Sequence, residues 1–230
     1  MIDLTLDGRS VTPATVYALG RNYAAHAREM GAPAEPVVFL KPRTALAPRG
    51  GVVPWPEGAT RVDHEVELVL LLGTGGRRLD LDAASRAIAG VAIGIDLTAR
   101  DLQAAAKRAG APWARAKGFP GSAPVSEFVS PDRFGRRWET LDLELTVGGE
   151  ARQRGSAARM LLDPPRIVAL LSRWFALEPG DVVFTGTPEG VGPVEPGRPV
   201  RAACRTLGLE VEVRLAAPAD NAAPGPPPGA

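Results

Sequence analysis

Short apolar runs with the alternation typical of strands dominate the sequence, and turn-forming residues separate them. Asp63 to Leu72 alternates and then becomes continuously apolar, which is typical of a strand that enters a core. Leu141 to Val147 alternates between Leu or Val and polar residues, and Val200 to Leu215 predicts two strands with a break at Gly208. Four shorter runs have the same character, namely Val16 to Leu19, Val37 to Leu40, Gly90 to Leu97 and Asp181 to Thr185.

Helical periodicity is limited to a few segments. Those segments are Asn22 to Met30, Leu81 to Ala89, Thr98 to Arg108 and Pro165 to Phe175. We expect Asn22 and Thr98 to act as N-terminal caps. The apolar stripe of the last helix is expected to hold Ile167, Leu170, Leu171 and Trp174. Because strands and helices do not alternate strictly, the pattern predicts a β-rich α+β domain with a few flanking helices.

The chain is expected to form one domain over residues 1–215, followed by a tail. Residues 216–230 are almost entirely Ala, Pro and Gly, and such a segment cannot bury enough apolar surface to offset its ordering entropy. We therefore expect residues 216–230 to be disordered. Cys204 is the only cysteine, which excludes an intramolecular disulfide and a zinc site built on several thiolates.

Charge and hydropathy narrow the classes of partner. Lys and Arg number 27 against 26 Asp and Glu, so no bulk positive field exists for a phosphate backbone or an acidic membrane surface. No apolar stretch reaches the ~18–20 residues of a membrane-spanning helix, and the first residues do not resemble a signal peptide. We expect a cytoplasmic protein whose partners include neither nucleic acid nor membrane.

The basic residues are almost all arginine, which makes the few lysines informative. Lysine occurs only at Lys41, Lys107 and Lys117. In so arginine-rich a chain, a retained lysine indicates a place where a compact, titratable ammonium is needed, although three residues can also persist by chance.

The first candidate site lies at Glu65 and Glu67, with Asp63 beside them. Residues two apart on a strand share one face and lie about 6.6–7 Å apart. Adjacent acids at the mouth of an apolar strand repel each other and lose solvation unless a cation lies between them. Oxygen ligands suit Mg²⁺, Mn²⁺ or Ca²⁺ rather than zinc. The alternative to a metal site is that Glu65 and Glu67 lie on a solvated strand edge. His64 points to the opposite face, where a packed, hydrogen-bonded histidine is expected.

The second candidate lies where a strand runs into a helix at Asp96. Arg100 and Gln103 are three residues apart on that helix and share a face. A third carboxylate, a guanidinium and an amide there would complete a metal site and hold a substrate carboxylate. The alternative makes Asp96 a turn residue and Arg100 a surface charge.

Three smaller features complete the candidate chemistry. His26 and Glu29 at i, i+3 would form a base that activates water, unless the histidine is incidental on an exposed helix. Lys117 precedes a glycine and would stabilise an anion or enolate, unless it is a surface lysine. Thr187 lies in a glycine-rich turn whose N–H groups would receive carboxylate oxygens, unless the turn is only structural.

Together these segments resemble the fumarylacetoacetate hydrolase family, in its short acylpyruvase-like branch. The matching motifs are Gly20-Arg21-Asn22-Tyr23 with His26 and Glu29, Phe39-Leu40-Lys41-Pro42, Glu65-x-Glu67, Asp96-x-Thr98-Ala99-Arg100-Asp101-x-Gln103, Lys117, and Gly186-Thr187-Pro188-x-Gly190-Val191-Gly192. They run in order through most of the chain. One departure is Gly197-Arg198, where the family usually has Gly-Asp.

The resemblance implies a β-sandwich roll, a homodimer and a divalent metal, usually Mg²⁺ or Mn²⁺. The residues implied are Glu65, Glu67 and Asp96 as metal ligands, Arg21, Arg100, Gln103 and Thr187 as substrate-binding residues, and His26, Glu29 and Lys117 as catalytic residues. The implied reaction is hydrolysis of a C–C bond in acylpyruvates, 2,4-dioxo acids such as fumarylpyruvate or acetylpyruvate, to pyruvate and a carboxylic acid.

Other reactions use the same enolate chemistry and stay open at the level of sequence. They are oxaloacetate decarboxylation or tautomerisation and isomerisation of 2-hydroxyhepta-2,4-diene-1,7-dioate. An alternative of another class is a non-catalytic relative that binds a metabolite. The intact pair of His26 and Glu29 argues against that alternative.

Overall fold

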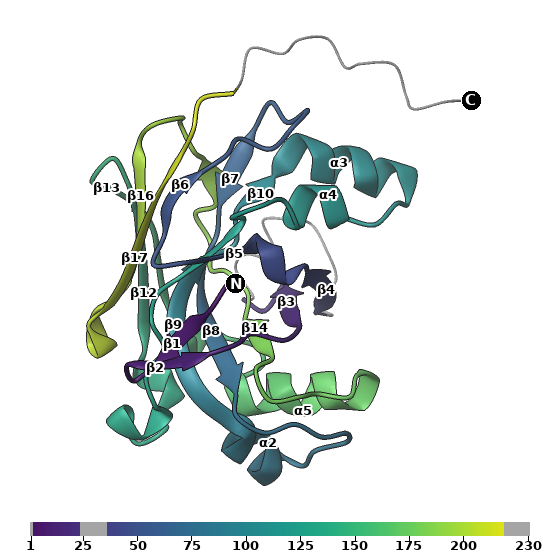
Figure 1. The fold of residues 1–230 in the computed structure, drawn as a ribbon, viewed down its shortest axis with the longest axis vertical. Helices are drawn as coiled ribbons and strands as arrows, with labels where there is room; N and C mark the ends of the chain where they lie inside the picture. The colour runs from purple at the N-terminus through teal and green to yellow at the C-terminus, as the bar shows by residue number, and fades with distance from the viewer. Residues whose placement is uncertain (1, 24–35, 219–230) are drawn as a thin grey trace.

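The computed structural model of this protein describes residues 2–23 and 36–218, and strands are its predominant regular structure (Figure 1). The largest sheet has seven strands in the order β4-β3-β14-β8-β9-β11-β5. In that order the strands are Val37–Lys41, Val16–Gly20, Val182–Phe184, Val66–Leu72, Ile88–Ile95, Ala123–Val125 and Leu46–Pro48. Every residue of β8 is buried, which explains its continuous apolar run.

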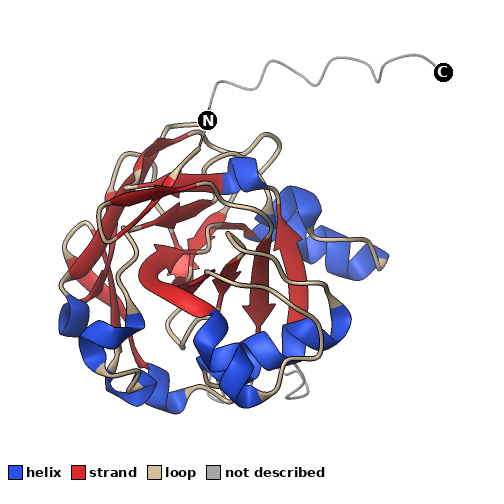
Figure 2. Cartoon of the chain, turned by 60° about the horizontal axis from the view of Figure 1, so that its bottom comes forward, coloured by secondary structure: helices blue, strands red, loops and turns tan. Residues whose placement is uncertain are grey.

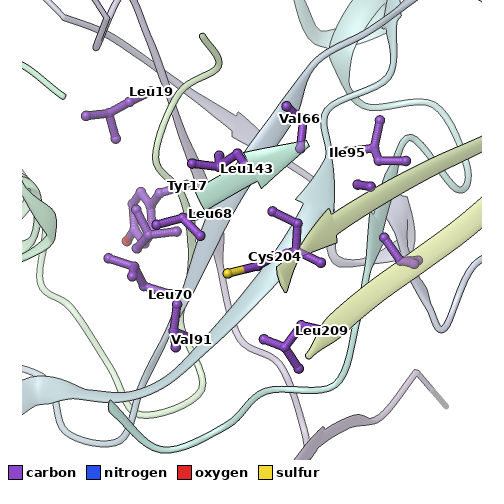
Figure 3. Close-up of a cluster of buried hydrophobic side chains, with 14 of the residues drawn as sticks. Tyr17, Leu19, Val66, Leu68, Leu70, Val91, Ile95, Leu143, Cys204 and Leu209 are labelled. Carbon is purple, nitrogen blue, oxygen red and sulfur yellow. The ribbon is translucent and has the colours of Figure 1, made fainter. Parts of the chain in front are cut away.

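A second sheet of five strands lies against the first, in the order β13-β12-β16-β17-β6. Its strands are Glu150–Ser156, Asp142–Val147, Pro199–Cys204, Leu209–Leu215 and Gly51–Val53. The main hydrophobic core fills the space between the two sheets, where alternate residues of β8 and β9 meet those of β12, β16 and β17 (Figure 3). The alternation in β12 and β17 therefore follows from one buried and one exposed face.

Two small sheets complete the strands. β1 (Leu4–Leu6) and β2 (Arg9–Val11) form an antiparallel pair. β7 (Val62–His64) lies between β10 (Thr98–Ala99) and β15 (Gly192–Pro193). The link from β7 to β8 is the single residue Glu65, so this small sheet leads directly into the large one.

The helices lie at the periphery of the strands (Figure 2). α2 (Leu81–Ala87) and α5 (Pro164–Trp174) pack together at one end, whereas α3 (Arg100–Ala109) and α4 (Ala114–Lys117) lie together at the other (Figure 1). No helix in the described part of the chain combines the length and the apolar character needed to cross a membrane.

Several expectations about helices were wrong in detail. Thr98 does not cap α3, because it pairs with Asp63 in the β10–β7 ladder and the helix begins two residues later. Leu81 to Ala89 ends early, since β9 begins at Ile88. Trp174 leaves the apolar stripe of α5, with 55% of its surface exposed.

Other expectations fall at the limits of the described residues. The segment Asn22 to Met30 lies outside them except for its first two residues, and there Tyr23 forms a bridge with Met160. Of the predicted tail only residues 216–218 are described, so its disorder stays a prediction. The pattern of alternating apolar and polar residues did not predict strands that contain few apolar residues. The main example is β13, which has only one fully buried position.

Candidate active site

Three acidic side chains meet at one end of β8 and β9. The ladder pairs Glu67 with Gly94, and the N–H of Asp96 donates to the carbonyl of Glu65 over 2.8 Å. Glu65, Glu67 and Asp96 thereby offer carboxylate oxygens that all lie within 4.8 Å of one another, and all three side chains are buried. The strand spacing that suggested a shared face for Glu65 and Glu67 is therefore realised, and the neighbouring strand supplies the third carboxylate.

Cations from the two adjacent helices contact this acidic cluster. Lys117 Nζ, at the end of α4, lies 2.8 Å from Glu65 Oε2 and 2.6 Å from Asp96 Oδ2. Arg100, the first residue of α3, donates to Glu65 and to Asp63 Oδ2, the latter over 2.8 Å. Asp63, which was expected beside Glu65 and Glu67, pairs with Arg100 and Arg61.

Lys41 is a third cation at the cluster, and its ammonium is completely buried. Its Nζ lies 2.7 Å from Asp96 Oδ1 and donates to the carbonyl of Lys117 and to Ser122 Oγ, the latter over 3.1 Å. Lys41 thus ties the edge strand β4 to α4 and to Asp96. Burial lowers the pKa of Lys41, and the nearby Asp96 carboxylate partly offsets this effect.

The three acids differ in how many cations contact them, and the pKa values of Glu65 and Glu67 differ accordingly. Burial alone would raise the pKa of Glu65, but Lys117 and Arg100 hold it below its ordinary value. The pKa of Glu67 is raised well above its ordinary value by burial and by the Asp96 and Glu65 carboxylates. Asp96 Oδ1, although close to Lys41, accepts no hydrogen bond of good geometry. Among the described residues Glu67 forms no ion pair and Asp96 Oδ1 accepts no hydrogen bond, so the donor set fits a divalent metal ion, which is a hard cation bound by oxygen ligands.

A glycine turn after β14 holds Glu67 from the other side. The N–H of Gly186 donates to Glu67 Oε2 over 2.6 Å, with Gly186 at φ 97°. A Cβ at Gly186 would lie 2.9 Å from the Cβ of Asn22. Asn22 fills this space with bonds to the carbonyls of Leu162 and Thr185 and from the N–H of Leu162. Asn22 is thus a buried cross-link between three segments. The helix that it was expected to cap lies outside the described residues, so this role stays a prediction.

A hydrogen-bond network orients Thr187, which follows this turn. Gln153 Oε1 accepts from Val66 N over 3.0 Å, whereas Gln153 Nε2 donates to Pro188 O over 3.0 Å. Since an N–H only donates and a carbonyl only accepts, these contacts fix the orientation of the amide. Nε2 then donates to Thr187 Oγ1 over 2.9 Å, and His64 Nδ1, 3.0 Å from Oε1, carries the proton. Thr187 accepts, so its own proton stays available for another acceptor.

One cavity is lined by seven of the predicted residues, namely Arg21, Glu65, Glu67, Arg100, Gln103, Lys117 and Thr187, and also by Lys107. Asp96 does not line it but contacts Lys117, which does. Gln103 Oε1 accepts from Arg100 Nη1 over 2.7 Å, which leaves its amide N–H groups for another acceptor. The structure therefore brings together eight of the ten residues predicted from the sequence. His26 and Glu29 lie outside the described residues, so their roles stay predictions.

Sequence reasoning missed two buried residues that support this site. Lys41 lies in the motif Phe39-Leu40-Lys41-Pro42 and is one of only three lysines. These two features could have indicated a role for it, but none was predicted. Gln153 left no signal, because its strand carries polar residues at nearly every position.

Comparison with known proteins agrees with the geometry. A family model described as fumarylacetoacetate (FAA) hydrolase C-terminal matches residues 15–217. The mitochondrial oxaloacetate tautomerase FAHD1 of Bos taurus is 43% identical over 189 residues, which cover 81% of this chain and 85% of that relative. The mitochondrial oxaloacetate decarboxylase of Dictyostelium discoideum is 36% identical over 203 residues, which cover 87% and 92%.

Solved structures extend the similarity to the fold. The structure of fumarylpyruvate hydrolase from Pseudomonas aeruginosa in complex with Mn²⁺ and pyruvate has a TM-score of 0.88 and 38% identity, covering 94% of this chain and 95% of that one. The predicted β-rich α+β roll with few helices is thereby confirmed. The match over nearly the whole chain, together with these relatives, shows that the protein belongs to the fumarylacetoacetate hydrolase family.

Proposed function

We propose that this protein is a divalent-metal-dependent enzyme that hydrolyses a C–C bond in acylpyruvates and releases pyruvate and a carboxylic acid. The observation that carries the proposal is the convergence of three buried carboxylates, two of which line a cavity together with Lys117 and Arg100. Glu65, Glu67 and Asp96 would hold Mg²⁺ or Mn²⁺. The neighbour from Pseudomonas aeruginosa, solved with Mn²⁺ and pyruvate, supports both the metal and the product.

The cavity offers two neutral donors for the carboxylate of a 2-oxo acid. Gln103 has amide N–H groups to give because its oxygen is engaged by Arg100. The Thr187 hydroxyl can donate because it already accepts from Gln153. Both side chains are held by further hydrogen bonds, so little rotational freedom is lost when a carboxylate binds between them.

Lys117 and Arg100 supply the positive charge for the reaction. The divalent ion that Glu65, Glu67 and Asp96 would hold would supply Lewis-acid chemistry toward the 2-oxo group. The buried Lys117 ammonium lies beside the same acids and compensates the negative charge that develops on that oxygen as the C–C bond breaks. From the sequence, His26 oriented by Glu29 would take a proton from the water that attacks the distal carbonyl, and that proton would return to C3 of the expelled enolate to give pyruvate.

Tautomerisation of oxaloacetate is the second candidate. The relative from Bos taurus is named for that reaction. It needs a carboxylate clamp, charge compensation and proton transfer at carbon, but no attacking water. The described residues Gln103, Thr187 and Lys117 supply the first two, so this reaction would survive loss of His26 more readily than hydrolysis.

A substrate panel separates these reactions. Metal-stripped protein is assayed with Mg²⁺, with Mn²⁺ and with EDTA for pyruvate release from acetylpyruvate and fumarylpyruvate, and for decay of enol-oxaloacetate absorbance. We expect metal-dependent pyruvate release that Glu67→Gln abolishes. Enol decay without pyruvate release would favour the tautomerase. An absence of metal-dependent turnover on every 2-oxo acid would refute both and favour the non-catalytic relative.

A further inference from the structure

The cavity carries two cations that the proposed chemistry does not use. Arg21 and Lys107 both line it, and neither forms an ion pair with any acid among residues 2–23 and 36–218. Glu65 and Asp96 are already engaged by Lys41, Arg100 and Lys117. Within residues 2–23 and 36–218, the part of the cavity near Arg21 and Lys107 thus has positive charge without a paired acid.

Helix α3 sets the distance between this charge and the acidic cluster. Arg100, Gln103 and Lys107 follow one another at i, i+3 and i+7, which places them on one helical face. Seven residues correspond to about 10 Å along a helix axis. Arg100 contacts Glu65 at the inner end, and Lys107 is exposed at the outer end. The face therefore runs from the acids to the mouth of the cavity.

An aromatic wall holds the Lys107 ammonium at that mouth. Lys107 Nζ lies 5.1 Å from the centroid of the Trp113 ring, which packs on Phe39 with centroids 5.9 Å apart. Both rings line the cavity. Partial burial and the charges of Arg100 and Arg21 lower the pKa of Lys107, so an anion bound there would relieve repulsion between cations.

Arg21 contributes from the opposite element, directly after β3. It adopts φ 67°, a left-handed conformation that costs a non-glycine residue energy. The next residue, Asn22, is anchored by its buried hydrogen bonds, which keeps this backbone in place. Arg49, Arg78 and Arg136 share this conformation without lining the cavity, so it is the place of Arg21 on the cavity wall that makes its guanidinium available to an anion.

We propose that Lys107, together with Arg21, binds a second carboxylate, at the far end of a dicarboxylic 2-oxo acid. Lys107 is thereby a specificity-determining residue that selects substrates with two acidic groups over monocarboxylic ones. The inference rests on the proposed function, since the first carboxylate and the 2-oxo group are placed at Gln103, Thr187 and the acidic cluster.

Binding of two inert ligands tests the proposal without turnover. Calorimetry in Mg²⁺ compares 2-oxoglutarate with 2-oxohexanoate, which has a similar length but no distal carboxylate. We expect the wild type to prefer 2-oxoglutarate. Lys107→Met, which keeps the aliphatic stem over Trp113, should weaken 2-oxoglutarate binding about five- to tenfold. It should leave 2-oxohexanoate binding within about twofold of the wild type.

Two control variants isolate the charge. Lys107→Arg should keep the preference, and Arg108→Met, which removes the neighbouring cation that does not line the cavity, should change neither ligand. Equal binding of both ligands by the wild type, or an equal loss for both in Lys107→Met, would overturn the inference and leave the proposed function standing. Binding of neither ligand in the presence of Mg²⁺ would overturn the proposed function and this inference with it.

Discussion

The orientation of Thr187 by Gln153 gives a prediction that can be worked out atom by atom. Gln153 Nε2 donates to Thr187 Oγ1 over 2.9 Å and to Pro188 O over 3.0 Å. Gln153→Glu keeps the shape of the side chain and keeps an acceptor for Val66 N, but it places a second oxygen where the donor was. The Thr187 hydroxyl would then donate to the introduced carboxylate and lose its proton for a substrate carboxylate.

The magnitude follows from the bond that is lost. A hydrogen bond to a charged group contributes about 1.5–3 kcal/mol, so we expect kcat/KM to fall roughly 10- to 150-fold. Thr187→Val removes the same donor directly and should cause a similar loss. Because both changes remove one interaction, the double variant should be little worse than either single variant.

The assay is a double-mutant cycle of kcat/KM on whichever 2-oxo acid is turned over, with folding checked by circular dichroism. The loss of the Pro188 contact should also lower the free energy of unfolding by about 1–3 kcal/mol. Arg154→Gln, an exposed change on the same strand, serves as the control and should have no effect. Wild-type kcat/KM in Gln153→Glu, or losses that multiply in the double variant, would refute the reasoning.

Three further predictions concern the metal, pH and the cysteine. Glu67→Gln should abolish the rise in melting temperature that Mg²⁺ gives the wild type, as measured by scanning fluorimetry. Burial raises the pKa of Asp142, but hydrogen bonds from Thr206 outweigh this and hold it below its ordinary value. The ionised Asp142 therefore adds about 1 kcal/mol, after screening by solvent, to the free energy of unfolding above pH ~4, and this contribution is lost at lower pH. In urea titrations, Asp142→Asn should be less stable than the wild type at pH 7 and equally stable near pH 2. Burial raises the pKa of Cys204 to about 11, so a disulfide reagent at pH 8 should label it only after unfolding.

The parts of the site that the sequence predicted are those set by local periodicity. Glu65 and Glu67 share a face because strand geometry fixes it, and the apolar residues after them showed that this face enters a core. Arg100 and Gln103 likewise follow from helical spacing. Such relations need no knowledge of which strands pair.

The parts that the sequence did not predict depend on pairing between distant segments. Lys41 reaches Asp96 only because β4 lies at an edge of the large sheet near α4, and Gln153 reaches Thr187 across 34 residues. Thr98 has the chemistry of a helix cap, but pairing with Asp63 decides its conformation. Tertiary contacts overrode local preference in each case.

The balance of charge connects the metal site to the kind of molecule it would take. Around the acidic cluster the contacting charges are Glu65, Glu67 and Asp96 against Lys41, Arg100 and Lys117. With Glu67 ionised, as a metal ligand must be, three negative and three positive groups balance, so a divalent cation would add two positive charges in a buried setting. An uncompensated buried charge is costly, and the enolate of a 2-oxo acid brings two negative charges, one on its carboxylate and one on its enolate oxygen. The cluster is therefore matched to such a ligand, and Arg21 and Lys107 remain as the charge that a further carboxylate would neutralise.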